Sequence, residues 1–493
     1  MHDASFEPRP DTAGRCRGAS LGLPVLGQKA QPVASSPPPG DAPIVAFVSL
    51  GCAKNLVDSE KMLGQLAESG ATLSGDEEAA DTIVVNTCGF LESSRQEALD
   101  VLRELAERKR RGTLQRIVVA GCLVQRDGEK LREWVPEIDA LVGVNNRDDV
   151  VRAVWRSDRD AGLDLFLGDY HPQPWSDQAR VRLTPRHYAY VRISEGCNQK
   201  CTFCTIPSIR GPMHSKTPEQ LVAECRELIA DGARELILIG QDTTSYGADI
   251  GAAGGLAGLL RTLDRECDGA RWIRLMYVYP SIFTDEMIDA IASCERVVKY
   301  IDIPLQHIND RVLRAMARRV TRKQTETLLD KLRRRIPGVS IRTTFIVGFP
   351  GETEAEFEEL CAFVRDFGFD AAGAFPYSLE PETPAGRMKD HVDPARIAQR
   401  HERLMLAQQG VALAGVRRWV GKSFDVLVDS DDETDERGAV ARHAGQAPEV
   451  DAVSILPDGG VEPGTFVNVK CVDTEDYDLV VKPVAQKLKT AKR

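Results

Sequence analysis

Short apolar runs alternate with longer segments of helical character along most of the chain, and this alternation limits the folds that the chain can adopt. In the first part the runs cover residues 44–50, 82–85 and 116–120, and the segments between them have helical patterns. A strand that is followed by a helix and then by another strand favours a parallel sheet, because the helix carries the chain back across the sheet. The predicted fold class is therefore α/β.

Two further parts of the chain follow. A polar, proline-containing stretch at residues 155–185 indicates a domain boundary. Six more strand-and-helix units come after it and predict a partial or complete α/β barrel of the TIM-like kind. From Gly421 onward, β-rich runs between Gly and Asp turns predict a small all-β barrel. The six runs are 188–193, 235–239, 273–278, 297–303, 340–347 and 371–375, and the β-rich runs are 424–428, 451–455, 465–472 and 477–481.

The length of the chain agrees with several domains, because 493 residues exceed what one hydrophobic core usually serves. Residues 1–41 contain the run Pro37-Pro38-Pro39-Gly40 and little apolar periodicity, which is typical of a disordered, Pro-rich extension. The predicted domains that follow are an N-terminal α/β domain at residues 42–155, a central barrel domain at 183–415 and a C-terminal β-barrel domain at 417–485.

The expected location of the protein bears on the role of its cysteines. No run of 18 apolar residues is present, and the N-terminus lacks a basic segment followed by an apolar one, so we expect a cytoplasmic protein without a membrane segment. Thiols stay reduced in the cytoplasm. The 12 cysteines therefore suggest metal ligation or catalysis before disulfides.

Three of these cysteines, Cys197, Cys201 and Cys204, form a C-x-x-x-C-x-x-C motif directly after the first strand of the second series. Three thiolates on one short loop suit an iron–sulfur cube, which needs four ligands and would keep one iron open. A structural zinc site is the alternative. It would need a fourth ligand, and the nearest candidate is His214, beyond two prolines.

The motif resembles that of the radical S-adenosylmethionine superfamily, in which an aromatic residue, here Phe203, precedes the third cysteine. The resemblance implies that the open iron binds S-adenosylmethionine, which an electron from the cluster cleaves to a 5′-deoxyadenosyl radical. It also implies that Gln241, after the second strand of the barrel, binds the methionine moiety of this cofactor. The alternative for Gln241 is a polar strand-end residue that faces water.

Cys52, Cys88 and Cys122 form a second pattern, because each of them comes just after an apolar run. They are separated by about one strand-helix-strand unit, so each is expected at the carboxyl end of a parallel strand. Three thiols could then converge there and hold a second cluster with one vacant position. The alternative is that small, half-buried cysteines simply end these strands.

This second pattern resembles the methylthiotransferases, and residues 49–60, Ser-Leu-Gly-Cys-Ala-Lys-Asn-Leu-Val-Asp-Ser-Glu, resemble the RimO branch of that family. The resemblance covers about residues 44–485 and implies an N-terminal cluster domain, a radical domain and a C-terminal TRAM domain. It implies two 4Fe-4S clusters and S-adenosylmethionine as cofactors. The implied transferase reaction inserts a methylthio group at the β-carbon of an aspartate in small-subunit ribosomal protein S twelve.

The charge distribution bears on the substrate. Residues 421–481 contain 15 Asp and Glu against 4 Lys and Arg, and the whole chain has a net charge of −11. An acidic surface repels a phosphate backbone and attracts a basic protein, so we do not expect direct nucleic-acid binding. Solvated loops that keep the protein in solution are the simpler explanation of these acids.

Two alternative functions stay open at this point. One is a transfer-RNA adenosine methylthiotransferase, like MiaB, and the other is a non-enzymatic iron–sulfur protein that binds the ribosome. For the enzyme, the expected partners are the ribosomal protein, a sulfur donor, and an electron donor such as flavodoxin or ferredoxin.

Overall fold

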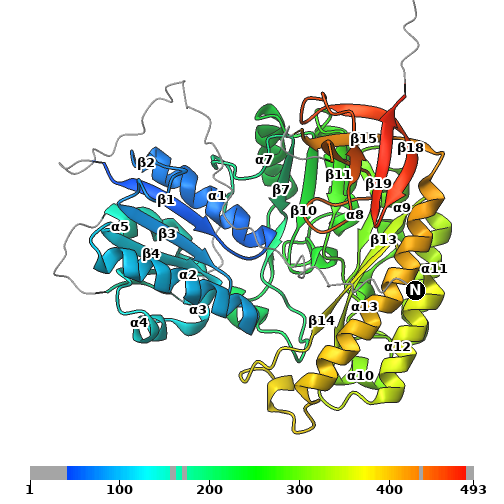
Figure 1. The fold of residues 1–493 in the computed structure, drawn as a ribbon, viewed down its shortest axis with the longest axis horizontal. Coiled ribbons are helices and arrows are strands. Elements are labelled where there is room, and N and C mark those ends of the chain that lie inside the picture. The colour runs from blue at the N-terminus through cyan, green and yellow to red at the C-terminus, as the bar shows by residue number, and fades with distance from the viewer. Residues whose placement is uncertain (1–41, 156–162, 169–174, 432–436, 485–493) are drawn as a thin grey trace, which may run out of the picture.

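The chain folds into three units that lie against one another, as Figure 1 shows in blue, green to yellow, and red. The computed structural model describes residues 42–155, 163–168, 175–431 and 437–484. The predicted disordered extension at residues 1–41 lies outside these residues.

A six-stranded parallel sheet forms the N-terminal unit, with the strand order β2-β1-β3-β4-β5-β6. Alternate residues of its central strand β3 face opposite ways: Ile83 and Val85 pack with helix α2, and Val84 packs with α1 and α5. Burial on both faces explains the continuous apolar runs. The strands are β1 (Ile44–Ser49), β2 (Thr72–Leu73), β3 (Thr82–Thr87), β4 (Arg116–Gly121), β5 (Ala140–Gly143) and β6 (Asp164–Phe166), and the helices are α1 (Ala53–Glu68), α2 (Glu92–Arg110), α3 (Cys122–Asp127), α4 (Lys130–Trp134) and α5 (Val150–Trp155).

Strands β1, β3 and β4 confirm the three predicted runs, whereas the sequence pattern did not reveal β2, β5 and β6. The three missed strands have two, four and three residues, which is too short for a strand pattern to stand out. Since β6 pairs with β5, the N-terminal sheet continues past residue 155, where the sequence placed the end of the domain.

The central unit is a parallel six-stranded sheet with the order β14-β13-β12-β11-β10-β7, and all six strands were predicted. Among the described residues β7 and β14 do not pair, so the sheet is a partial barrel. The strands are β7 (Tyr188–Arg192), β10 (Glu235–Ile239), β11 (Trp272–Leu275), β12 (Val297–Asp302), β13 (Ser340–Val347) and β14 (Ala371–Pro376), and the helices are α6 (Ile206–Arg210), α7 (Pro218–Ala230), α8 (Gly255–Glu266), α9 (Asp285–Ser293), α10 (Asp310–Ala315), α11 (Arg322–Arg335), α12 (Glu354–Phe367) and α13 (Pro394–Val416).

Local signals explain where several of these helices begin. Thr217, Thr321 and Thr353 cap α7, α11 and α12, and each accepts a hydrogen bond from the backbone N–H three residues on. In return, a side-chain oxygen of the Gln or Glu at that third position accepts a hydrogen bond from the backbone N–H of the threonine. This reciprocal pairing satisfies donors that a helix cannot satisfy internally, so it fixes the starting residue.

The C-terminal unit is a closed barrel, which confirms the predicted small all-β barrel. Its five strands have the order β15-β16-β17-β19-β18, and β16 was not among the four predicted runs. Strand β16 contains Arg442 and His443, which are both buried, so its sequence does not look like a strand. Arg442 pairs with Glu235 of the central unit and with Asp429. The strands are β15 (Ser423–Ser430), β16 (Ala439–His443), β17 (Ser454–Leu456), β18 (Phe466–Glu475) and β19 (Asp478–Pro483).

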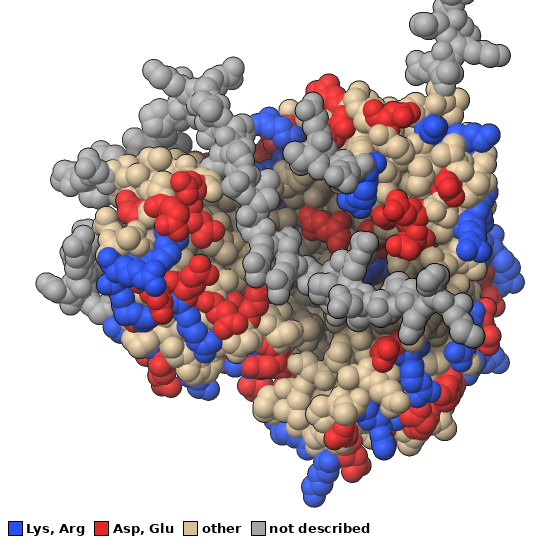
Figure 2. Space-filling view, in the orientation of Figure 1, with Lys and Arg blue, Asp and Glu red and all other residues tan. Residues whose placement is uncertain are grey.

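Part of the acidic excess of this barrel faces the central unit. Glu449 accepts hydrogen bonds from the hydroxyls of Tyr188 and Tyr190, at 3.0 and 3.2 Å, and the Tyr300 hydroxyl donates to Asp451 at 2.7 Å. These carboxylates therefore dock the two units onto each other. Other acidic side chains lie in and around the central hollow of the face shown in Figure 2.

Helix α1 packs closely on the segment that connects the first two units, and Gly64 permits this contact. A Cβ atom at Gly64 would lie 2.1 Å from the backbone oxygen of Ala179. We therefore expect Gly64→Ala to lower the free energy of unfolding by about 1–3 kcal/mol, measured by urea denaturation. Gly410→Ala, in the helix α13, meets no atom within 4 Å. This control should raise stability by about 0.5–1 kcal/mol, and equal effects of the two changes would contradict the packing argument.

A search of the described helices finds none with the length and apolar character that crossing a membrane requires.

Candidate functional site

Cys52, Cys88 and Cys122, the N-terminal triad, lie at the same edge of the first sheet. Cys52 precedes α1, Cys88 follows β3, and Cys122 begins α3 directly after β4. Since β1, β3 and β4 are parallel neighbours, their carboxyl ends meet there. A Cβ atom at Gly51, whose φ is +95°, would lie 2.7 Å from the Cβ of Cys88, so the two loops touch. The structure thus brings these three cysteines together, as the sequence predicted.

Asn55, which was not predicted from the sequence as a site residue, connects these strand ends by hydrogen bonds. Its side-chain amide donates to the backbone oxygens of Leu50 and Thr87, at 2.8 and 2.9 Å. The Cys122 thiol lies 3.6 Å from the Asn55 Oδ1. One buried side chain therefore holds the three loops of the triad in register.

Arg210 is the second residue that was missed, and it connects the triad to the central unit. Its guanidinium donates to the Sγ of Cys122 at 3.2 and 3.3 Å, and it pairs with Glu195 at 2.8 Å and with Asp58 at 3.0 Å. Burial raises the pKa of the Cys122 thiol to about 12, although the charge of Arg210 opposes this rise. A cation that donates two hydrogen bonds to a buried sulfur favours the thiolate.

Glu195 continues this connection toward the barrel. Burial alone would raise its pKa, but Arg210 and Arg192 together lower the pKa to about 2, so Glu195 is an anion at neutral pH. The side-chain amide of Gln241, at the end of β10, donates to the other carboxylate oxygen. A buried chain of contacts therefore runs from Cys122 through Arg210 and Glu195 to Gln241.

Cys197, Cys201 and Cys204, the loop triad, lie on one loop between the short strands β8 (Ser194–Glu195) and β9 (His214–Ser215), which pair and close its base. Burial raises the pKa of Cys197 to about 11 and that of Cys204 to about 12. The Sγ of Cys201 lies 4.0 Å from the Tyr279 hydroxyl and 3.8 Å from an Nη of Arg318. Half-buried thiols on one short loop are placed for a shared cofactor.

Phe203 is half-buried and packs in a small apolar cluster with Val312, Met316, Phe349 and Ala385. This packing anchors the loop triad to the central unit. The binding of a cofactor by Phe203 stays a prediction, and so does the role of Gln241.

The donor sets fit iron–sulfur clusters. Across the described residues, no three Cys, His, Asp or Glu side chains gather closely enough to hold one metal ion. In a cube each thiolate binds a different iron, so the sulfur atoms need not crowd as they do around one zinc ion. Three thiolates with one iron left open suit this cofactor in both triads.

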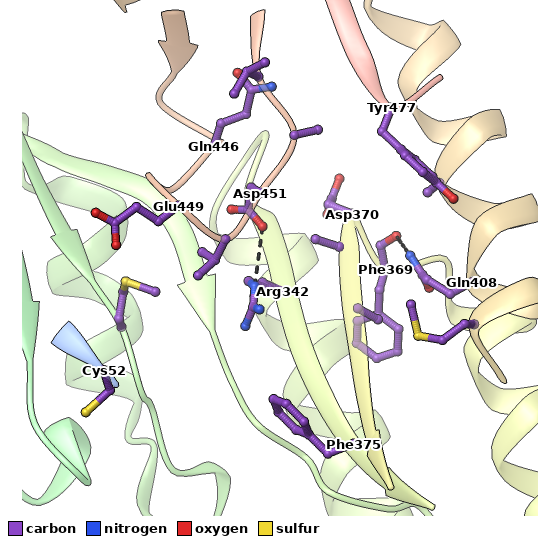
Figure 3. A pocket seen from close by; sticks show the side chains of 18 of the residues that line it. Cys52, Arg342, Phe369, Asp370, Phe375, Gln408, Gln446, Glu449, Asp451 and Tyr477 are labelled. Atoms are coloured by element: carbon purple, nitrogen blue, oxygen red, sulfur yellow. Dashed lines mark hydrogen bonds and ion pairs between the residues drawn. The ribbon is translucent and has the colours of Figure 1, made fainter. Parts of the chain in front are cut away.

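A cavity of about 3090 Å³ lies where the three units meet. Cys52 and Cys88 are in its wall, together with strands of the central unit, helix α13 and loops of the C-terminal barrel. Figure 3 shows Cys52 at the lower left of the cavity, Glu449 above it, and Arg342 and Asp451 toward the middle of the view. Small-molecule pockets usually have about 300–1,000 Å³, so this cavity has room for part of a macromolecule.

His443, in the wall of this cavity, gives the structure a dependence on pH. Its burial and the nearby Arg274 and Arg442 lower its pKa from 6.5 to about 3, so the folded protein keeps it neutral. In the unfolded chain this histidine binds a proton below about pH 6.5, whereas in the folded protein it does not. The free energy of unfolding should therefore decrease as the pH falls from 6.5 to 3, by up to about 1.4 kcal/mol per pH unit. Urea denaturation between pH 7 and 4 should show a weaker dependence for His443→Gln, and an identical dependence would contradict this.

Family models match the three units separately. The radical SAM superfamily matches residues 191–364, the uncharacterized protein family UPF0004 matches residues 44–143, and the TRAM domain matches residues 420–484.

Close relatives match nearly the whole chain. The ribosomal protein uS12 methylthiotransferase RimO of Anaeromyxobacter sp. (strain K) is 45% identical over 438 residues, which cover 89% of this chain and 92% of the relative. The protein of that name from Bdellovibrio bacteriovorus is 41% identical and covers 90% of this chain and 98% of the relative.

Among solved structures, the radical S-adenosylmethionine methyltransferase TsrM of Kitasatospora setae, with cobalamin and a 4Fe-4S cluster bound, is similar with a TM-score of 0.52. It is 16% identical, and the match covers 70% of this chain and 77% of that one. This likeness confirms the fold alone.

Proposed function

The chain belongs to the RimO family of radical S-adenosylmethionine methylthiotransferases, and we propose that its two cysteine triads hold the two 4Fe-4S clusters of this transferase. The proposed reaction inserts a methylthio group at the β-carbon of an aspartate in ribosomal protein uS12. The relatives that cover about nine tenths of this chain are named for that substrate.

The observation that carries the proposal is the buried chain of contacts from Cys122 to Gln241. Two cofactors that act on one substrate carbon must stay at a fixed separation, because effective catalysis requires the reacting groups to be held in place. Arg210, Glu195 and Gln241 fix the N-terminal triad against the carboxyl end of β10 through contacts of 2.5 to 3.3 Å. Ligands of parallel α/β units gather at such strand ends.

The residues of the chain have separable tasks in this proposal. Bound S-adenosylmethionine with its cluster supplies the one-electron chemistry that breaks a carbon–hydrogen bond of the substrate. The loop triad holds that cluster, Gln241 and Phe203 orient the cofactor, and the N-terminal triad holds the cluster associated with the transferred sulfur.

The cavity and its charges support a protein substrate. Its volume of about 3090 Å³ can accept a loop of a protein, and Asp370, Asp476 and Asp478 are in its wall. Carboxylates favour the approach of a basic ribosomal protein over that of a nucleic acid. We further propose that the partners of the protein include a sulfur donor and an electron donor such as flavodoxin or ferredoxin. The proposed location is the cytoplasm.

Mass spectrometry of ribosomal proteins and transfer RNA, from cells with and without the gene, tests this function. We expect one methylthio group to disappear from uS12 when the gene is absent, and transfer RNA to be unchanged. Loss from a transfer-RNA adenosine would instead support the alternative substrate. An anaerobic assay that detects no 5′-deoxyadenosine from the reduced protein would exclude the enzyme and favour the non-enzymatic alternative.

A further inference from the structure

The side chain of Lys54 crosses from the N-terminal unit to the central barrel, two residues after Cys52. Its Nζ lies 3.4 Å from the centroid of the Tyr277 ring. Over the residues that the structure describes, no carboxylate pairs with this ammonium group. An aromatic face attracts a cation but leaves the N–H donors of the ammonium group available to another partner.

Tyr277 is held firmly beneath this lysine. Its φ of +60° is unusual for an aromatic residue. Its backbone N–H donates to Asp302 at 3.1 Å, and its backbone oxygen accepts from the N–H and hydroxyl of Thr243. A strained backbone persists only where its surroundings determine it, and such positions concentrate at functional sites. The Tyr277 ring also lines the large cavity, beside Cys52.

Two other cations, one near Lys54 and one near Tyr277, already have carboxylate partners. Arg342, in the middle of the view in Figure 3, pairs with Asp302 at 3.0 Å and with Asp451 at 3.4 Å. Arg210 pairs with Glu195 and Asp58, as described above. Of these three cations, Lys54 alone has no carboxylate of the described chain within ion-pair distance. Lys54 is not itself in the cavity wall, but Tyr277 and Cys52 are, so a carboxylate that enters between them comes close to the ammonium group.

We propose that Lys54 binds the side-chain carboxylate of the substrate aspartate and determines which residue is modified, an inference that rests on the proposed function. In aspartate the carboxylate carbon is bonded directly to the β-carbon. An ammonium–carboxylate hydrogen bond of about 2.7–2.9 Å therefore holds the β-carbon close to Lys54, beside the N-terminal triad. An uncharged asparagine, of nearly the same shape, loses the ion pair at this position. Lys54 is thus a specificity-determining residue.

Lys54→Met tests this proposal, because it keeps an apolar stem over the Tyr277 ring and removes the charge. The measurement is the anaerobic binding of recombinant uS12, and of uS12 with the modified aspartate changed to asparagine, to the reconstituted full-length protein. The unaltered protein should prefer the aspartate form about tenfold or more. Lys54→Met should bind both forms equally, while it retains its iron and the substrate-independent formation of 5′-deoxyadenosine.

Two further variants make the result specific. Lys54→Arg keeps a cation and should retain part of the preference. Lys331→Met is the matched control, because Lys331 pairs with Asp285 at 2.8 Å on an outer helix, and it should retain the full preference. A full preference in Lys54→Met, or its loss in the control, would overturn the role of Lys54 and leave the proposed function standing. If the unaltered protein neither binds nor modifies uS12, the proposed function fails, and this inference fails with it.

Discussion

Replacing Cys197, Cys201 and Cys204 together by alanine is expected to lower the iron content of reconstituted protein from about eight to about four atoms per chain. Cleavage of S-adenosylmethionine should be abolished, because in the proposed function the loop triad holds the cluster that donates the electron. Iron analysis and an anaerobic assay for 5′-deoxyadenosine measure the two effects. Loss of all iron would show that the clusters are not independent and would count against the proposal.

The complementary replacement of Cys52, Cys88 and Cys122 should also leave about four irons. Formation of 5′-deoxyadenosine should continue, because the loop triad is on a separate unit, but sulfur insertion into uS12 should stop. A product that still carried sulfur would refute the role proposed for the N-terminal triad. Cys294→Ala is the control for both experiments, since this buried cysteine lies at the end of α9, outside both triads, and its removal should cost no iron.

Arg210→Met is expected to lower the free energy of unfolding by about 3–5 kcal/mol. Arg210 is buried, and its removal leaves two buried carboxylates, Asp58 and Glu195, with fewer cationic partners. It also removes both hydrogen bonds to the Cys122 sulfur, at 3.2 and 3.3 Å, and so the contact between the N-terminal triad and the central unit. Urea denaturation under anaerobic conditions measures the loss.

A suitable control is Arg226→Met, because Arg226 is exposed where it pairs with Glu266 at the surface, and such surface pairs contribute only about 0–1 kcal/mol. Arg210→Lys should recover part of the stability, since it restores the charge but not the forked geometry. Equal stabilities of the Arg210→Met and Arg226→Met proteins would show that the buried chain does not hold the units together.

The sequence predicted most of the strands that contain several consecutive apolar residues, because burial on both faces of a sheet produces such runs. It missed β16, where Arg442 and His443 are buried, since that strand is stabilised by pairing with Glu235 of another unit. The acidic excess of residues 421–481 was also visible in the sequence. Its role in docking the barrel was not visible, because Glu449 and Asp451 accept hydrogen bonds from tyrosines more than 150 residues away.

The sequence by itself determined the fold class, the three units and the strand-end positions of the cysteines, because a residue that directly follows a buried run must lie at the end of a strand. Only the tertiary structure decided what surrounds these cysteines. Arg210 meets Cys122 across 88 residues and Asn55 across 155, and Lys54 meets Tyr277 in another unit. Local pattern carries no information on such distant pairs, since they depend on how the packed units dock.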